Sequence, residues 1–381
     1  MRDRLEGASL AVDRRVRSSP HFTCTDKNIP PRSRVSRIMR SICTVLAASL
    51  AFSLSAPALA TSGVELRGSI GAKPQYVLIS FDNSNELWDR SRVLAQRSNA
   101  KFTYFLSCVF LIDRDDRKSY QAPNEPAGRS NIGFATSKAD IAQRLDNIWR
   151  ARNEGNEIAS HACGHFDGKT WSKTDWEHEL TTYKQVLSNA WSKYGADPEP
   201  QGWKHFVDAE IRGFRAPYLS EGPALLSALR DKGYVFDGSG VSRGPALPLH
   251  AGGLYQFGLP TIDEGPKNKP VIAMDYNLFV RHSGAVERPD HLDEFENRAY
   301  DAFKGAFERQ YEGKRIPFQI GLHFTLMNGD AYWRALERFT SEVCVKADVR
   351  CTTYSEYLKE TGGTMPVAGA ELVKPAASGG I

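Results

Sequence analysis

Two histidines lie four residues apart in the segment EIASHACGHFDG, which covers residues 157–168. These are His161 and His165, in a chain that contains nine histidines in all. Neutral imidazoles are common ligands of Zn²⁺, and a catalytic zinc ion is typically held by three protein ligands and a water molecule. The pair therefore indicates two ligands of a divalent metal site, with Zn²⁺ as the expected ion. A polar turn that merely contains histidines is the alternative.

Polar side chains also follow short apolar segments at several other places along the chain. In parallel α/β folds the carboxyl ends of the strands meet at one edge, where chemistry gathers. One such residue would mean little, because an Asp after a strand often caps the next helix and a single His is often a core residue. Their repetition at the same relative place favours one shared site, made of Asp82, His161, Arg215 with Tyr218, Asp237, Asp275 and His323.

The chemistry that suits these residue types is metal-assisted hydrolysis. A bound metal ion lowers the pKa of its water and polarises a carbonyl group. A carboxylate must then take the proton of the water, and an acid must protonate the leaving nitrogen. Asp82 is the candidate base and His323 the candidate acid.

Short apolar segments alternate with longer segments of helical periodicity, which favours an α/β fold with a mainly parallel sheet. A loop over 113–135 is long enough to indicate a substrate-facing insertion. Strands are predicted near 76–81, 101–107, 157–160, 211–218, 234–239, 271–279 and 318–324, and helices near 86–98, 137–155, 175–195, 222–233 and 289–312.

The N-terminal region is typical of an exported protein. Met39-Arg40 precedes an apolar run and the ending Ala58-Leu59-Ala60, so we interpret residues 39–60 as a signal peptide. The run is too short to span a bilayer, and no stable membrane insertion is expected after cleavage. We expect residues 1–38 to be a spurious extension, 61–74 a linker, 75–362 a catalytic domain and 363–381 a flexible tail, with the protein secreted or periplasmic.

Charge gives no case for nucleic-acid binding once this segment is removed. The chain has 49 Lys and Arg against 45 Asp and Glu, and residues 1–60 hold ten of the former and four of the latter. The remainder is therefore 39 minus 41, a net charge of −2. The sequence identifies no protein partner.

Four cysteines remain after residue 60, and in an exported protein they permit two disulfides with three possible pairings. Cys344 and Cys351 are close enough in sequence for a local loop, which would leave Cys108 with Cys163. Four buried thiols are the alternative.

The ordered motifs resemble those of the polysaccharide deacetylase family, also called the NodB homology family, over roughly residues 75–360. SFDN, HACGH, RAPY and GLH match four family motifs, and MDY around Asp275 matches another loosely. The family includes chitin and peptidoglycan deacetylases. The resemblance implies a distorted (β/α) barrel of about seven parallel strands that removes N-acetyl groups from GlcNAc-type glycans.

The resemblance also implies a role for each matched residue. Asp82 would be the base, oriented by Arg215, and His323 the acid, tuned by Asp275. The metal ligands would be His161, His165 and Asn83, the backbone N–H of Tyr218 would hold the oxyanion, and Pro217 and Trp171 would contact the sugar. Trp171 could equally be a packing residue, like Trp88, Trp176 and Trp203.

Two positions depart from the family pattern. Asn83 replaces the Asp that is the third metal ligand, and an amide oxygen is neutral and binds a divalent cation more weakly. Ala162 replaces a Ser or Thr whose hydroxyl braces the histidine loop, a task that a disulfide from Cys163 to Cys108 could take over.

Three functions follow from these residues. The first is a metal-dependent carbohydrate N-deacetylase. The second, suggested by Asn83, is a metal-independent hydrolase of cyclic amides, against which the signal peptide argues. The third is a glycan-binding protein without activity, against which the retained Asp82, Arg215 and His323 argue.

Overall fold

The computed structural model describes residues 73–83 and 87–364. The predicted extension, signal peptide and most of the predicted linker and tail lie outside these residues, so those predictions stand untested. No helix in the two described ranges is long and apolar enough to cross a membrane.

The strands form a mostly parallel sheet in the order β10-β1-β2-β3-β4-β5-β7. A further strand, β9, lies off this path and also pairs with β1 in parallel. Two short strands, β6 and β8, pair antiparallel with β7. The bounds are β1 Gln75–Asp82, β2 Thr103–Leu106, β3 Glu157–Ser160, β4 Gly213–Phe214, β5 Phe236–Ser242, β6 Leu249–Ala251, β7 Leu254–Glu264, β8 Lys269–Ile272, β9 Phe318–His323 and β10 Val349–Thr352.

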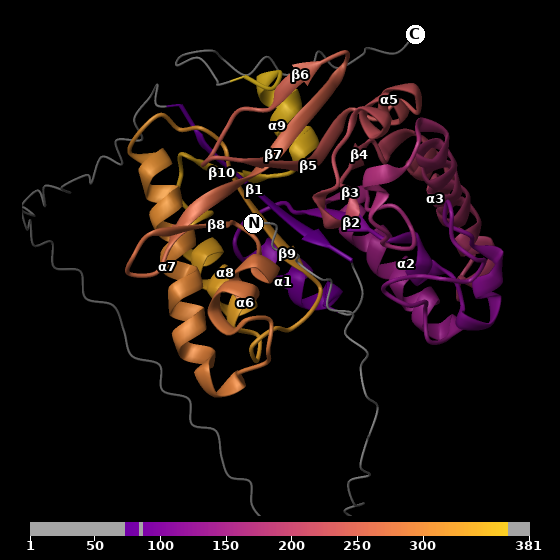
Figure 1. The fold of residues 1–381 in the computed structure, drawn as a ribbon, viewed down its shortest axis with the longest axis horizontal. Coiled ribbons are helices and arrows are strands. Elements are labelled where there is room, and N and C mark those ends of the chain that lie inside the picture. The colour runs from indigo at the N-terminus through magenta and orange to yellow at the C-terminus, as the bar shows by residue number, and fades with distance from the viewer. Residues whose placement is uncertain (1–72, 84–86, 365–381) are drawn as a thin grey trace, which may run out of the picture. The chain divides into compact units, whose positions relative to one another are not determined.

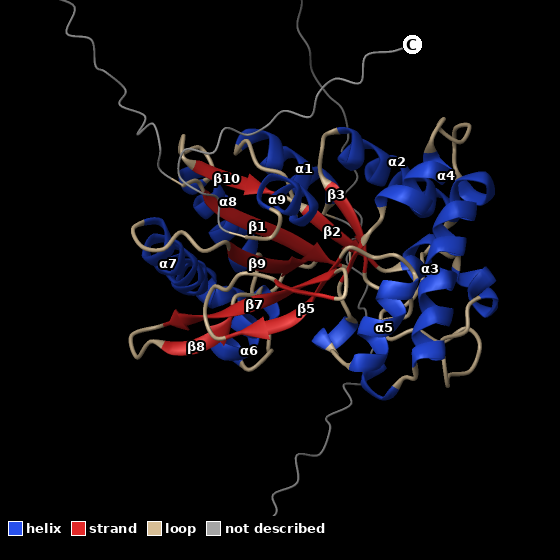
Figure 2. Cartoon of the chain, turned by 90° about the horizontal axis from the view of Figure 1, so that it is seen from above, coloured by secondary structure: helices blue, strands red, loops and turns tan. Residues whose placement is uncertain are grey.

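The sheet curls strongly, so that β7 and β9 approach each other. The Gln319 side chain donates a hydrogen bond to the carbonyl oxygen of Gly258 at 2.9 Å. Ala273 bridges the two strands, since its N–H donates to Pro260 and its carbonyl accepts from Gly321, both at 2.9 Å. The predicted α/β fold with a curled, mostly parallel sheet is thereby confirmed, and helices lie outside the strands (Figure 2).

Helices α2, α3 and α5 lie on one side of the strands, and α6, α7 and α8 lie on the other (Figure 1). Helix α3 begins with a capping box, because Ser172 and Asp175 bond each other's backbone N–H groups. The bounds are α1 Trp88–Arg97, α2 Lys138–Asn153, α3 Lys173–Tyr194, α4 Trp203–His205, α5 Pro223–Asp231, α6 Asp275–Ser283, α7 Leu292–Tyr311, α8 Ala331–Val343 and α9 Tyr354–Thr361.

The prediction of a strand over 271–279 is wrong beyond Ile272. Helix α6 begins at Asp275, whose carboxylate accepts the N–H of Tyr276 at 2.7 Å. Leu278 and Phe279 are buried while Tyr276 and Val280 are exposed, which is a helical rather than an alternating pattern. The β6-β7-β8 meander before it was not predicted.

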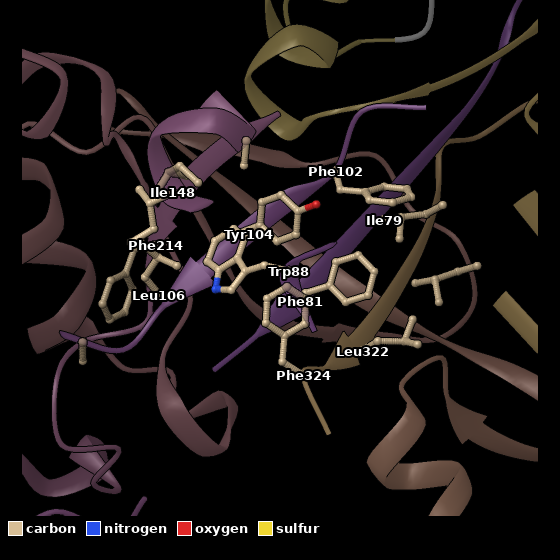
Figure 3. Packing of buried hydrophobic residues seen from close by; sticks show 14 of the residues in the cluster. Ile79, Phe81, Trp88, Phe102, Tyr104, Leu106, Ile148, Phe214, Leu322 and Phe324 are labelled. Atoms are coloured by element: carbon tan, nitrogen blue, oxygen red, sulfur yellow. The ribbon is translucent and has the colours of Figure 1, made fainter. Parts of the chain in front are cut away.

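An aromatic cluster packs behind the end of β1 (Figure 3). The Phe81 ring lies 5.0–5.7 Å from the ring centroids of Phe102, Tyr104, Phe324 and Trp333. Large aromatic side chains bury much apolar surface, and truncating one to Ala typically costs about 3–5 kcal/mol. This cluster holds the backbone of the adjacent residue, Asp82, in a fixed place.

Both predicted disulfides are present. Cys108 bonds Cys163, and Cys344 bonds Cys351. The first joins the segment after β2 to the segment after β3, and it therefore ties down the residues between His161 and His165.

Candidate active site

Strand register brings the predicted residues to one edge of the sheet. Asp82 on β1 pairs with His323 on β9, and neighbouring strands lie about 4.8 Å apart. Ser160 on β3 pairs with Phe214 on β4, so the residues that follow them, His161 and Arg215, also lie side by side.

Asp82 and Arg215 form a buried ion pair. The guanidinium Nη1 donates to Oδ1 of Asp82 at 2.9 Å, with the two side chains 0% and 3% exposed. Burial by itself would raise the pKa of Asp82, but the charges of Arg215, His161 and His323 and the hydrogen bond from Arg215 together outweigh burial, and the pKa lies below its ordinary value. Asp82 is therefore an ionised carboxylate at neutral pH, and only its Oδ1 is bound by Arg215.

Other groups fix Arg215 in this place. It donates to the Ser80 hydroxyl at 2.8 Å, the Gly238 carbonyl at 3.0 Å and the Tyr354 hydroxyl at 3.0 Å. Its guanidinium carbon also lies 4.2 Å from the Phe105 ring centroid. With four of its five N–H groups donating to these oxygens and to Asp82, the guanidinium orients the carboxylate.

His161 has a defined tautomer. Its Nδ1 lies 2.8 Å from the carbonyl oxygen of Arg215, which can only accept, so Nδ1 carries the proton. Its Nε2 is buried and has no partner among the described residues. Burial lowers the pKa of His161 to about 4, which keeps the ring neutral with a free lone pair on Nε2.

His165 lies against His161, with ring centroids 5.1 Å apart. Its backbone is left-handed, with φ at 55°, and within the described chain its buried Nδ1 has no hydrogen-bond partner. Burial lowers its pKa to about 3. A buried polar nitrogen without a partner is costly, and two of them side by side fit a divalent metal ion such as Zn²⁺.

Asn83 follows Asp82 at the end of β1, and its amide oxygen already has a partner. The Ser107 hydroxyl donates to Asn83 Oδ1 at 2.7 Å, and one lone pair of that oxygen remains. In the part of the chain that is described, no group of three or more His, Cys, Asp and Glu is placed to hold a metal. The residues thus fit an ion held by two imidazoles, with Asn83 or water completing the shell.

His323 is paired with Asp275, as the sequence suggested. Its Nδ1 lies 2.7 Å from Asp275 Oδ1, and its backbone N–H donates to Oδ2 at 2.7 Å. Burial would lower the pKa of His323, but the Asp275 charge and hydrogen bond outweigh it, and the pKa lies above its ordinary value. The imidazole is therefore held protonated to higher pH than a free histidine.

The turn after β4 presents Tyr218. Its φ is 58°, its side chain is 60% exposed, and its ring lies 4.9 Å from that of His165. No acceptor among the described residues takes its backbone N–H, which leaves it available for a ligand, while the adjoining Pro217 is buried.

A second exposed tyrosine, Tyr276, lies near His323 and was not proposed from the sequence. It is 52% exposed, and its ring centroid lies 6.4 Å from that of His323. Its position directly after Asp275 in the MDY motif was the available signal.

Two other candidates lie away from the open part of the site. Trp171 is 7% exposed and packs edge-on against Trp176, so it is part of the core, as are Trp88 and Trp203. Asp237 is fully buried, and burial raises its pKa to about 7. It accepts the Ser239 hydroxyl, which in turn accepts the N–H of Ala216, so it supports the turn after Arg215.

Comparison with known proteins gives a consistent group of folds. No family model matches the chain, and no curated protein sequence does. A Mycobacterium smegmatis structure described as a polysaccharide deacetylase matches with 16% identity and a TM-score of 0.47, covering 80% of this chain and 96% of that one. Other structures described as polysaccharide deacetylases or family 4 carbohydrate esterases also match.

Two further matches are a chitin deacetylase and a mutated pseudoenzyme. The chitin deacetylase of the fungal pathogen Colletotrichum lindemuthianum matches with 12% identity and a TM-score of 0.41, covering 75% of this chain and 88% of that one. A mutant of a family 4 carbohydrate esterase pseudoenzyme, with restored activity, matches with 12% identity and a TM-score of 0.40, over 75% and 68% of the two chains.

Proposed function

We propose that this protein is a metal-dependent carbohydrate N-deacetylase that hydrolyses the N-acetyl groups of GlcNAc-type glycans. One observation carries the proposal. An ionised carboxylate, a protonated imidazole and two neutral imidazoles with unpartnered nitrogens meet at one edge of the sheet. Hydrolysis of an amide needs a base, an acid and a polarising group, and each has a candidate here.

Asp82 acts as the base. Arg215 binds Oδ1 and leaves Oδ2 to take a proton from a water molecule. Because its pKa is held below the ordinary value, the carboxylate is ready to act throughout the neutral range. Ser80 accepts a hydrogen bond from the same guanidinium nitrogen, but Asp82 is the only one of the two that can take a proton.

His323 acts as the acid. Its Nδ1 is engaged with Asp275, so its Nε2 is the atom that donates a proton to the leaving amine. Asp275 stabilises the charged ring and, through the His323 backbone N–H, also fixes its position. His323 and Asp82 are paired across β1 and β9, which would let both groups act on one substrate amide.

A divalent ion bound by His161 and His165 would polarise the acetyl carbonyl and lower the pKa of the attacking water. The backbone N–H of Tyr218 would stabilise the developing oxyanion. The exposed rings of Tyr218, near His165, and Tyr276, near His323, would suit the apolar faces of a sugar chain. The predicted export of the protein would place it where such glycans occur, outside the cytoplasm.

Acetate release tests the proposal directly. The full chain, purified from exported material, is assayed on N-acetylchitooligosaccharides and on peptidoglycan after zinc loading and after chelation. Release that requires zinc and is lost in His161→Ala supports it. Undiminished release after chelation would contradict the metal requirement.

The two alternatives give other outcomes in the same assay. A cyclic-amide hydrolase would open a hydantoin ring without metal and release no acetate from glycans. A binding protein would retain chitooligosaccharides in calorimetry, with no turnover under any metal condition.

A further inference from the structure

The backbone of residues 161–165, here called the histidine loop, is held by segments far away in the sequence. The loop begins with the His161 N–H bound to the carbonyl of Leu106 at 2.7 Å, and the Cys108 N–H donates to Ala162 at 3.1 Å. From the long loop after β2, Asn131 contributes its N–H to Gly164 and its side-chain amide to His165, both at 2.9 Å. The predicted substrate-facing insertion therefore also supports the candidate metal site.

The two N–H groups at the middle of the loop point inward, to a carboxylate on α3. Glu179, which is 1% exposed, accepts the N–H of Cys163 at 2.9 Å and that of Gly164 at 3.4 Å. The Tyr120 hydroxyl donates to Glu179 at 2.9 Å and accepts the Gly164 N–H at 2.9 Å. A Cβ at Gly164 would lie 2.6 Å from the Tyr120 hydroxyl, so only glycine permits this approach.

Packing alone does not explain a carboxylate at position 179. The neighbouring buried residues on α3 are apolar or aromatic, including Trp176, Leu180 and Tyr183. A buried carboxyl is costly unless it is hydrogen-bonded, and an apolar side chain would fill the same space at lower cost. The donors that Glu179 binds are those of the histidine loop and Tyr120, which ties its presence to that loop.

The loop also needs external support because its backbone is strained. Ala162 and His165 have φ values of 57° and 55°, a left-handed region that is unfavourable for residues other than glycine. Such a conformation persists only where the surroundings enforce it. Cys163 and Gly164 lie between the two imidazoles, so their placement determines how His161 and His165 face each other.

We propose that Glu179, with Tyr120, is a positioning residue that fixes the histidine loop so that the two imidazole nitrogens converge on one ion. This rests on the proposed function in one respect, namely that the imidazoles are metal ligands. Glu179 itself touches neither ion nor substrate. It acts through the backbone of Cys163 and Gly164.

Two measurements on Glu179→Gln test the proposal. The substitution keeps the side-chain volume and removes one acceptor oxygen. Groups that orient metal ligands typically contribute 10–100-fold to affinity, so we expect zinc affinity in calorimetry to fall about tenfold. In the metal-free protein, hydrogen exchange of the Cys163 and Gly164 amides should become faster. Tyr120→Phe, which leaves the carboxylate in place, should give a smaller loss.

Glu157→Gln is the matched control. Glu157 is also bound by hydroxyls, those of Thr103 and Ser355, but it lies at the start of β3, away from the histidine loop. The Glu157→Gln substitution should lower the melting temperature without changing zinc affinity or the hydrogen exchange of the Cys163 and Gly164 amides. Equal zinc affinity for Glu179→Gln and the parent would overturn the proposal. If the parent binds no zinc, the metal part of the proposed function fails, and the hydrogen-exchange rates alone test the positioning role. Faster exchange of the Cys163 and Gly164 amides in Glu179→Gln then supports that role, and unchanged exchange overturns it.

Discussion

Replacing Asp82 with Asn should abolish most turnover and also destabilise the protein. The amide keeps nearly the same volume but cannot take a proton, and general bases typically contribute about 10²–10⁴-fold to the rate. We therefore expect kcat to fall by that factor. A general base acts in the chemical step, so KM should change much less than kcat.

The loss of stability follows from Arg215, which would stay buried without a charged partner. Removing one member of a buried ion pair typically costs about 3–5 kcal/mol. Here the Asn oxygen can still accept from Nη1, and the oxygens of Ser80, Gly238 and Tyr354 remain bonded to the guanidinium. We expect about 2–3 kcal/mol, the size of a hydrogen bond to a charged group. At about 2–4 °C per kcal/mol this lowers Tm by about 4–12 °C.

Rate and stability are separated by a control on the same guanidinium. Ser80→Ala removes one acceptor from Arg215 but leaves the Asp82 carboxylate, so it should cost about 1 kcal/mol with activity nearly retained. Acetate release is measured on zinc-loaded protein well below Tm, and Tm by calorimetry. A folded, metal-loaded Asp82→Asn variant that keeps more than a tenth of the parent kcat would refute Asp82 as the base.

Four further predictions follow from the same contacts. Asp82 must be ionised and its pKa is lowered, while His323 must be protonated and its pKa is raised, so the pH profile of kcat/KM should be a broad bell. Asp275→Asn removes the charge that raises the pKa of His323, so the alkaline limb of the profile should move to lower pH. An unmoved alkaline limb would exclude His323 as the acid. Asn83→Asp should tighten zinc binding in calorimetry, since it adds a negative charge to a site with two neutral ligands, and weaker or equal affinity would mean that position 83 does not face the ion. Removing Cys108–Cys163 should destabilise more than removing Cys344–Cys351, about 4 against about 2 kcal/mol from loop lengths of 55 and 7 residues, as denaturant unfolding of the two double Ser variants can compare. Export should yield a protein that begins near Thr61, and N-terminal sequencing that finds residues 1–38 would contradict both the signal peptide and the start at Met39.

The sequence by itself predicted the fold class and roughly where each candidate site residue lies relative to its strand. Alternating apolar and helical segments predicted the α/β fold, and the carboxyl ends of those segments carried Asp82, His161, Arg215 and His323. This works because periodicity reports local burial, and parallel strands bring their ends to a common edge. Cysteine spacing likewise favoured the pairing that the structure contains.

Local pattern also misled in places. The apolar run over 271–279 predicted one strand, but the chain leaves β8 and begins α6 at Asp275. Short apolar runs fit a buried strand and a buried helix equally well, and tertiary packing decides between them. Trp171 was a candidate sugar contact, but it belongs to the core. The residue type alone does not show whether a tryptophan side chain faces the interior or a substrate.

Only the tertiary structure decided which side chains of the site contact one another. The Arg215 guanidinium meets Asp82 across 133 residues of sequence, and its carbonyl fixes the His161 tautomer across 54. Glu179 on α3 accepts a hydrogen bond from the Cys163 N–H in the histidine loop, and the Ser107 hydroxyl donates to the Asn83 amide oxygen. These contacts depend on the curl of the sheet and on which strands become neighbours. That information is spread over the whole chain, so no short stretch of sequence contains it.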